Sequence, residues 1–418
     1  MIQLIIIVFG ISIVDFVTVW GIERTFPQFI SSHQRKLRIA FIILAAVSIL
    51  LVFWGFIFQD KISDYRLLAW YYYFWGVLGA IYLPKSFYVF LLMVDWTLSK
   101  FSKLYRRQFD KHPRGSRQII AKCGFWSGLA LIGLIVWSIF FGRSNFKVDQ
   151  VDIYVDDLPN AFHGYKIALI SDIHAGSFSA SSGRFQKAVD LINQQEPNLI
   201  VSVGDIVNNF AGEILNLIPI FSQLEANDGK YAVLGNHDYG GYYKWNNPAD
   251  SVANFYAIIN AVENMGFEFL NNQAVVISRY NADRMALIGV ENWGVKKRHP
   301  KRANLEVAMA SVKKIPFKVL LSHNPLYWHK EVEGKTDITL TLSGHTHGMQ
   351  MGIKLGKKYF SLASLLGLPY GAGLYQSGKQ YLYVNRGLGV VGFPGRFGMS
   401  PEISIISLWK EKKSPEQQ

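Results

Sequence analysis

Residues 337–347 read "DITLTLSGHTH": an apolar run stops at a serine and a glycine, and two histidines follow. A short apolar run of this kind predicts a buried strand. His345 and His347 stand on either side of one threonine, although the whole chain has only ten histidines. The segment therefore predicts a strand that presents two imidazoles at its carboxyl end.

Four other segments repeat this arrangement of an apolar strand followed by Gly, Asp, His or Asn. They are "YKIALISDIH" (165–174), "NLIVSVGDIV" (198–207), "GKYAVLGNHD" (229–238) and "FKVLLSHNP" (317–325). Residues 184–195 and 252–265 have helical spacing between such strands, which predicts an α/β domain. Because ligands bind at the carboxyl ends of strands in α/β sheets, we expect these polar residues to gather on one rim.

The residues of the predicted rim are hard oxygen donors and imidazoles. They are Asp172, His174, Asp205, Asn236, His237, Asp238, His323, His345 and His347. A single divalent ion cannot coordinate all of these side chains. Two ions about 3.5–4 Å apart could share them and catalyse displacement at phosphorus. Mixed Asp, His and Asn ligation without a thiolate favours Mn, Fe or Zn at a reactive site over a structural zinc site.

The series Asp-x-His, Gly-Asp, Gly-Asn-His-Asp, His and Gly-His-x-His resembles the calcineurin-like metallophosphoesterase superfamily. Here it reads "SDIHAG", "VGDIVNN", "LGNHDY", "LSHNP" and "SGHTHG", in that family's order, within residues 150–410. The likeness is greatest to the bacterial branch in which this domain follows membrane spans. It implies a two-sheet β-sandwich flanked by helices. It also implies hydrolysis of a phosphate ester, phosphodiester or pyrophosphate by a metal-bound hydroxide.

The resemblance also implies a role for each rim residue. Asp172, His174 and His347 would bind the first metal. Asn236, His323 and His345 would bind the second, and Asp205 would bridge both. His237 would face the phosphate, stabilise charge in the transition state and protonate the leaving oxygen.

Softer expectations concern the surroundings of the metals. Asp238 is expected to brace the backbone or a ligand histidine. Many relatives have an acid that orients the catalytic histidine where this chain has Asn208. This neutral amide can still accept a hydrogen bond, but it would stabilise a protonated His237 less strongly. Arg386 is a candidate phosphate contact, and for Arg396 a solvated loop position is an equal alternative. The apolar segment 360–376 either touches lipid or packs under the rim.

The first third of the chain is predicted to be membrane-spanning. Segments 1–20, 39–58, 67–98 and 123–141 are each long and apolar enough to cross a bilayer as a helix. Lys85 and Asp95 in the third segment are expected to snorkel toward the cytoplasmic side. The predicted domains are a four-helix transmembrane region (1–142), a linker (143–150), the phosphoesterase domain (151–411) and a disordered tail (412–418).

The distribution of basic residues predicts the orientation of the chain. The first connection carries Arg24, Arg35, Lys36 and Arg38, and the third carries Lys100, Lys103, Arg106, Arg107, Lys111, Arg114, Arg117 and Lys122. The positive-inside rule makes both connections cytoplasmic, so the C-terminal domain faces the periplasm or the cell exterior. The net charge of +13 is then explained by contact with anionic headgroups, and no nucleic-acid partner is expected.

Two classes of function follow from these observations. The leading hypothesis is a multi-pass, membrane-anchored phosphoesterase with two metal ions, for which the anchor favours a lipid-linked or envelope-derived substrate. The alternative is an envelope sensor or accessory protein that binds metal without turnover. The complete ligand set together with His237 favours the enzyme, because a non-catalytic protein is free to lose some of these residues.

Overall fold

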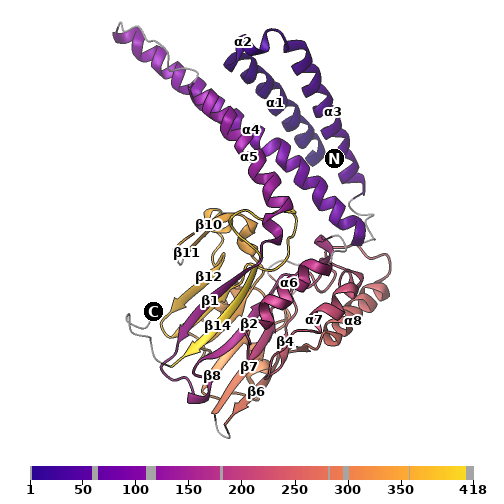
Figure 1. The fold of residues 1–418 in the computed structure, drawn as a ribbon, viewed down its shortest axis with the longest axis vertical. Coiled ribbons are helices and arrows are strands. Elements are labelled where there is room, and N and C mark those ends of the chain that lie inside the picture. The colour runs from indigo at the N-terminus through magenta and orange to yellow at the C-terminus, as the bar shows by residue number, and fades with distance from the viewer. Residues whose placement is uncertain are drawn as a thin grey trace. The chain divides into compact units, whose positions relative to one another are not determined.

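The computed structural model describes residues 2–58, 65–109, 119–178, 182–280, 283–294, 301–356 and 358–410. The main boundary between its two compact units lies between Ile139 and Phe140. A helical unit precedes this boundary, and a mixed α/β unit follows it (Figure 1). The predicted tail, 412–418, lies outside the described residues, as do Asp110, Lys111, Arg114 and Arg117 of the predicted third connection.

Within the described residues, five helices lie wholly or mostly in the helical unit. They are α1 (Ile2–Thr25), α2 (Pro27–Ile30), α3 (Gln34–Phe58), α4 (Tyr65–Phe109) and α5 (Ile119–Phe140). Within the described residues, four segments are long and apolar enough to cross a membrane: Leu4–Thr25, Gln34–Ile57, Trp70–Phe101 and Ile119–Ser144. These are the four segments predicted from the sequence. Helix α4 has 45 residues, so it continues beyond its apolar part into the basic stretch that was predicted as a connection.

The expectation that Lys85 snorkels is wrong. Its ammonium lies 2.5 Å from the carboxylate of Asp15 on α1, and the side chains of Lys85 and Asp15 are only 12% and 7% exposed. Tyr82 donates a second hydrogen bond to Asp15, at 2.9 Å. Lys85 lies near the middle of the apolar segment Trp70–Phe101, where an unpaired charge is costly and pairing with a neighbouring helix is the way to keep it.

Two six-stranded sheets form the framework of the second unit. In spatial order the first contains β1 (Lys147–Tyr154), β14 (Glu402–Trp409), β2 (Tyr165–Ile170), β3 (Leu199–Ser202), β4 (Lys230–Ala232) and β5 (Glu268–Phe269). The second contains β12 (Gly373–Ser377), β13 (Gln380–Val384), β9 (Leu340–Ser343), β8 (Phe317–Leu321), β7 (Asp283–Gly289) and β6 (Gln273–Arg279). Strand β1 begins at Lys147, inside the segment predicted as a linker.

Alternating side chains place each sheet between two apolar layers. On β2, Ile167 and Leu169 belong to the core between the two sheets. Ala168 and Ile170 point to the opposite face and pack with helices α6 (Ser182–Asn193), α7 (Ile218–Phe221) and α8 (Pro248–Asn264). A third apolar cluster joins the outer face of the second sheet to α9 (Leu305–Met309) and the turn Trp328–Val332. The period of two along each strand therefore produces a helix-flanked sandwich.

The parallel strands of the two sheets end at one rim. Strands β2, β3 and β4 are parallel neighbours in the first sheet, and β8, β9 and β13 are parallel neighbours in the second. The five predicted polar segments follow β2, β3, β4, β8 and β9. The prediction of a rim is thus confirmed, with the difference that two packed sheets contribute to it, rather than one open sheet.

Candidate metal centre

The rim brings the predicted ligands together although they are spread over more than 170 positions of the chain. Three groups of side chains each place their ligand atoms within 4.8 Å of one another. The groups are Asp172, His174 and His347; His174, Asp205 and His237; and Asp205, His323 and His345. Asn236 joins the last group, since its side-chain oxygen lies 3.1 Å from Nε2 of His323.

Asp205 lies between the two outer groups. Its Oδ2 is 3.6 Å from Nε2 of His174 and 3.2 Å from Nε2 of His323. Its Oδ1 accepts a hydrogen bond from the backbone N–H of His237, at 2.8 Å. One oxygen of this carboxylate therefore faces both groups, while the backbone holds the other.

Two buried imidazole nitrogens indicate that these residues could bind a cation. Nε2 of His174 and Nε2 of His347 are buried and make no hydrogen bond with any described residue. Nε2 of His347 is also 3.2 Å from Oδ1 of Asp172, without the geometry of a hydrogen bond. Because buried polar atoms nearly always have a partner, two such nitrogens converging with a carboxylate fit the coordination of a divalent cation.

Hydrogen bonds on the far side of the rings select which nitrogens face inward. Nδ1 of His323 lies 2.7 Å from the backbone oxygen of Val203. Nδ1 of His174 lies 3.1 Å from the side-chain oxygen of Asn208. Because these oxygens can only accept, Nδ1 of each ring carries a proton, and the two Nε2 atoms face the centre.

The backbone is strained at five of the seven predicted ligands. Positive φ angles occur at Asp172 (48°), His174 (43°), Asp205 (55°), His345 (75°) and His347 (51°). The left-handed region is unfavourable for residues other than glycine, and such strain clusters at functional sites. Packing of the two sheets therefore stabilises a conformation that these residues would not adopt alone.

Gly344 allows the loop after β9 to approach the loop after β2. A Cβ atom at this position would lie 2.4 Å from Oδ2 of Asp172. The same carboxylate oxygen accepts a hydrogen bond from the backbone N–H of His345, at 3.0 Å. The glycine in the "SGHTH" segment is thus explained by a close contact, since only a residue without a side chain fits there.

The electrostatics of the centre favour ionised carboxylates. Burial raises the pKa of Asp172 and Asp205, but neighbouring histidines, chiefly His347 and His323 respectively, more than offset it and hold both pKa values below their usual range. Burial lowers the pKa of His323, yet the Asp205 carboxylate reverses this and raises it to about 9. Two buried, negatively charged oxygen ligands surrounded by imidazoles are an electrostatic environment suited to cations.

A comparison with known families agrees with this geometry. Residues 165–349 match the family described as calcineurin-like phosphoesterase. The chain carries a calcineurin-like metallophosphoesterase domain. The matched range begins at β2 and ends just beyond His347, so it contains every predicted metal ligand.

Named relatives include membrane proteins and a pyrophosphatase. A transmembrane protein with metallophosphoesterase domain from Danio rerio is 28% identical over 77% of this chain and 70% of its own length. The UDP-2,3-diacylglucosamine pyrophosphatase LpxG of Chlamydia muridarum is 27% identical over 65% of this chain and 92% of its own. The crystal structure of a dimetal phosphatase from Danio rerio is 11% identical over 54% of this chain and 88% of its own, with a TM-score of 0.31.

In the phosphoesterase domain, His237, like His345, is more accessible than the other members of the centre. It is half-buried, whereas Asp172, His174, Asp205 and His323 are buried. Its ring stacks on Tyr242 with centroids 4.1 Å apart and an interplanar angle of 14°. Nδ1 lies 2.8 Å from the backbone oxygen of Asn208 and donates to it. Nε2 is therefore the nitrogen that can accept and release a proton.

The expected role of the Asn208 side chain is wrong in one respect. The sequence suggested that it stands in for an acid that orients His237, but its side-chain oxygen accepts from His174 instead. The backbone oxygen of the same residue orients His237. A backbone contact does not depend on the side chain, which is why the absence of an acid at this position leaves His237 oriented.

Asp238 and Glu213 hold the backbone of the phosphoesterase rim. Asp238 accepts from the N–H groups of Asp205, Ile206 and Gly235, each at 2.8 Å. Burial and the Asp205 carboxylate raise the pKa of Asp238 to about 7.

Sequence reasoning missed Glu213, whose buried carboxylate accepts hydrogen bonds from the N–H groups of Gly176, Asn208, Asn209 and Phe210. It lies in no recognisable motif, so only the folded loop reveals it.

The two arginines of the loop after β13 are structural in this arrangement. Arg386 is 3% exposed and its guanidinium lies 3.0 Å from the carboxylates of both Asp149 and Glu402. Its charge is already paired, which favours a structural role over the predicted contact with phosphate. Arg396 is 1% exposed and donates to the backbone oxygens of Gly389, Met399 and Arg386, so it is no solvated loop residue.

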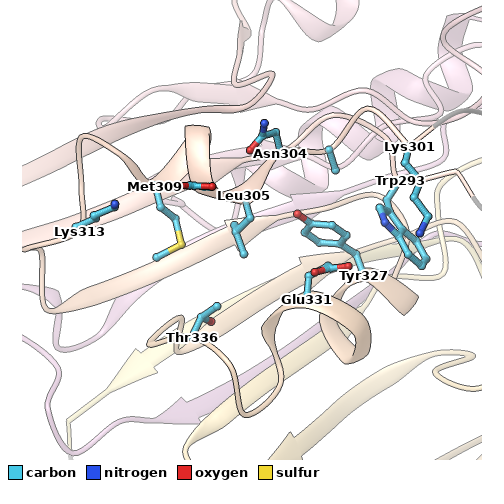
Figure 2. A pocket seen from close by; sticks show the side chains of 11 residues that line it. Trp293, Lys301, Asn304, Leu305, Met309, Lys313, Tyr327, Glu331 and Thr336 are labelled. Atoms are coloured by element: carbon cyan, nitrogen blue, oxygen red, sulfur yellow. The ribbon is translucent and has the colours of Figure 1, made fainter.

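A cavity of about 510 Å³ lies elsewhere in the domain, beside α9. Figure 2 shows its side chains, among them Trp293, Tyr327 and Lys301, whose ammonium lies 4.7 Å from the ring of Trp293. Lys301 and Lys313 are mixed there with Glu306 and Glu331, and the described lining contains none of the predicted ligands. It offers no convergent set of carboxylates and imidazoles, so we place the chemistry at the rim.

Proposed function

We propose that this protein is a membrane-anchored phosphoesterase that uses two divalent ions. Asp172, His174 and His347 would hold the first ion, and Asn236, His323 and His345 the second, with Asp205 between them. The observation that carries the proposal is the shared Oδ2 of Asp205, which faces Nε2 of both His174 and His323. Nε2 of His174 and Nε2 of His347, which are buried and make no hydrogen bond with any described residue, support it.

The donor set narrows the identity of the ions. Imidazole, carboxylate and amide ligands without a thiolate suit Mn, Fe or Zn, and Cys123, the only cysteine of the chain, lies in α5 of the helical unit. Two such ions, when bound, activate water and neutralise phosphate charge. The ionised carboxylates of Asp172 and Asp205 supply the negative charge that retains them.

His237 is proposed to act on the leaving oxygen. Its Nδ1 proton is fixed on the backbone oxygen of Asn208, so Nε2 points away from that bond and can carry the proton that the leaving group needs. The ring is held by stacking on Tyr242. A histidine that is oriented, half-buried and adjacent to ionised carboxylates is a suitable general acid.

The location of the domain and the class of substrate complete the proposal. The basic residues around the first and third connections support a multi-pass topology with the C-terminal domain outside the cytoplasm. A reporter enzyme that works only outside the cytoplasm, fused after Gln418, should be active. Activity of a cytoplasm-only reporter there would overturn this orientation.

A phosphodiester or pyrophosphate on a lipid is the substrate class that an anchored domain reaches most readily, and LpxG is a pyrophosphatase of a diacylated sugar nucleotide by name.

The test of activity uses the full-length protein. Purified in detergent and loaded with Mn, it should hydrolyse bis(p-nitrophenyl) phosphate, and EDTA should remove this activity until Mn is restored. A protein that retains two bound ions but hydrolyses neither phosphate monoesters, diesters nor pyrophosphates would contradict the proposed reaction and favour a metal-binding sensor.

Asn208 provides a test of the support behind the first ion. Asn208→Ala removes the partner of Nδ1 of His174, and losing such an outer partner should weaken the affinity for one Mn ion by roughly 10–100-fold. The backbone oxygen that orients His237 remains, so saturating Mn should restore most of the activity. Mn titrations of activity measure this. Activity that stays low at saturating Mn would show that the side chain acts on His237 after all.

A further inference from the structure

The hairpin that follows the metal centre is apolar on its outer face. Strands β10 (Gly352–Leu355) and β11 (Lys358–Ser361) form a two-stranded sheet of their own, apart from the two large sheets (Figure 1). Ile353 pairs with Phe360 across the hairpin, and Leu355 follows on the same face as Ile353. These three side chains are about half exposed, at 50%, 48% and 58%.

The opposite face of the hairpin carries its polar contacts. Lys354 pairs with Tyr359, and both side chains contact the carboxylate of Asp149 on β1. The guanidinium of Arg386 lies 4.2 Å from the centre of the Tyr359 ring and 3.0 Å from Asp149. The hairpin is therefore the reverse of an ordinary surface hairpin, which faces polar residues to water and apolar residues to the core. An ion-pair network fixes this reversal.

Helix α10 (Leu362–Leu365) extends the same apolar surface. Leu365 and Leu366 are 79% and 63% exposed, and Leu368 is 50% exposed. The lipid-docking surface is defined here as Ile353, Leu355, Phe360, Leu365, Leu366 and Leu368. Six large apolar side chains exposed within 16 positions exceed the scattered apolar residues of a normal surface and mark an interaction site.

The covalent connection to an apolar segment favours lipid as the occupant. The apolar segment that includes α5 ends at Ser144, and Asp149, to which the hairpin is bonded, lies five residues later. Five residues reach at most about 18 Å, so a bilayer spanned by that segment lies within reach of the hairpin. Lys358 at the turn is exposed and suits anionic headgroups. A soluble partner has no comparable connection.

We propose that the lipid-docking surface inserts into the bilayer interface and presents lipid-borne phosphate esters to the metal centre. This inference rests on the proposed function, because the surface begins only six residues after the proposed ligand His347. Substrate acyl chains would stay in the membrane while the phosphate reaches the ions. Backbone hydrogen bonds of 2.8 and 3.0 Å join Gln350 and Gly352, between His347 and the lipid-docking surface, to Phe397. They support a connection between this surface and the metal centre.

Depth of insertion is measured without any need for activity. The full-length protein with Cys123→Ser and Leu355→Cys is labelled with an environment-sensitive fluorophore and placed in nanodiscs of phosphatidylcholine and phosphatidylglycerol with brominated acyl chains. Bromine should quench this label. The matched control is Val307→Cys on α9, since Val307 and Leu355 are equally exposed at 57% and 58%. Bromine should not quench the label at position 307. A label at position 355 that is accessible to water, or shielded from water but not quenched, overturns the proposal; the latter would indicate a protein partner.

A second arm separates this surface from the reaction itself. Leu355→Glu with Phe360→Glu should reduce hydrolysis of a vesicle-borne phosphodiester by about tenfold or more, since burying these two apolar side chains in the bilayer would stabilise docking. Hydrolysis of soluble bis(p-nitrophenyl) phosphate should be unchanged. Equal losses on both substrates would contradict a docking role. Quenching at position 355 in a protein without any activity would leave the surface supported and the proposed reaction refuted.

Discussion

Replacing Asp205 by alanine should abolish hydrolysis of bis(p-nitrophenyl) phosphate by the full-length protein. The loss should exceed the roughly 100-fold cost of removing an outer partner of a ligand, because Asp205 faces both groups of the centre with one oxygen. Steady-state kinetics at saturating Mn measures the loss. Mn should not rescue it, since the variant lacks the charge that both ions share.

Two further variants make the result for Asp205 specific. Asp205→Asn keeps the shape and one oxygen but removes the charge, so it should be nearly as inactive as the alanine variant. Asp190→Ala removes an exposed carboxylate on α6 and should leave both kinetics and Mn content unchanged. An Asp205→Ala protein that keeps more than a tenth of the wild-type rate would refute a bridging role.

Replacing His237 by alanine should lower kcat by roughly 10²–10⁴-fold, the range for loss of a general acid. The Mn content should stay at the wild-type level, because His237 is not among the proposed ligands. This outcome is informative because the ligand atoms of His237, His174 and Asp205 lie within 4.8 Å of one another, close enough to share an ion. A fall in bound Mn would reassign His237 as a ligand.

The leaving group distinguishes the two contributions assigned to His237. A nitrophenolate leaves with little help from a proton, whereas an alkoxide needs one, so the loss should be larger for an alkyl phosphodiester than for the nitrophenyl substrate. Equal losses would indicate that His237 only stabilises charge on the phosphate. His329→Ala is the matched control, since His329 is exposed and bonded to Glu333, and it should change neither rate.

The metal ligands could be predicted from the sequence because their residue types recur in one local pattern. Each follows an apolar strand, and parallel strands bring their carboxyl ends to one edge. The strands were predicted from short apolar runs and the four apolar helices from long ones. Hydrophobic periodicity does not say which sheet each strand joins. The rim shared by two sheets is therefore visible only in the pairing of β2, β3 and β4 and of β8 and β9.

The errors concern residues whose partners are distant in sequence. Lys85 was expected to snorkel because its partner, Asp15, lies 70 positions away. The contact of Arg386 with phosphate stays a prediction, although its pairing with Asp149, 237 positions away, favours a structural role. The side chain of Asn208 was assigned to the wrong histidine, since position in a motif does not say whether a side chain or a carbonyl makes the contact. Glu213 was missed because buried acids that cap backbone N–H groups leave no motif.

The number of metal ions per chain tests the central claim most directly. Full-length protein is stripped with a chelator, reloaded with Mn, freed of excess ion and analysed for metal and protein by mass spectrometry. The wild-type protein should hold two Mn ions per chain, and His345→Ala and His347→Ala should each hold one, because each histidine would serve a different ion. A wild-type chain that holds a single ion, or two variants that both retain two, would contradict a dinuclear centre divided between His345 and His347.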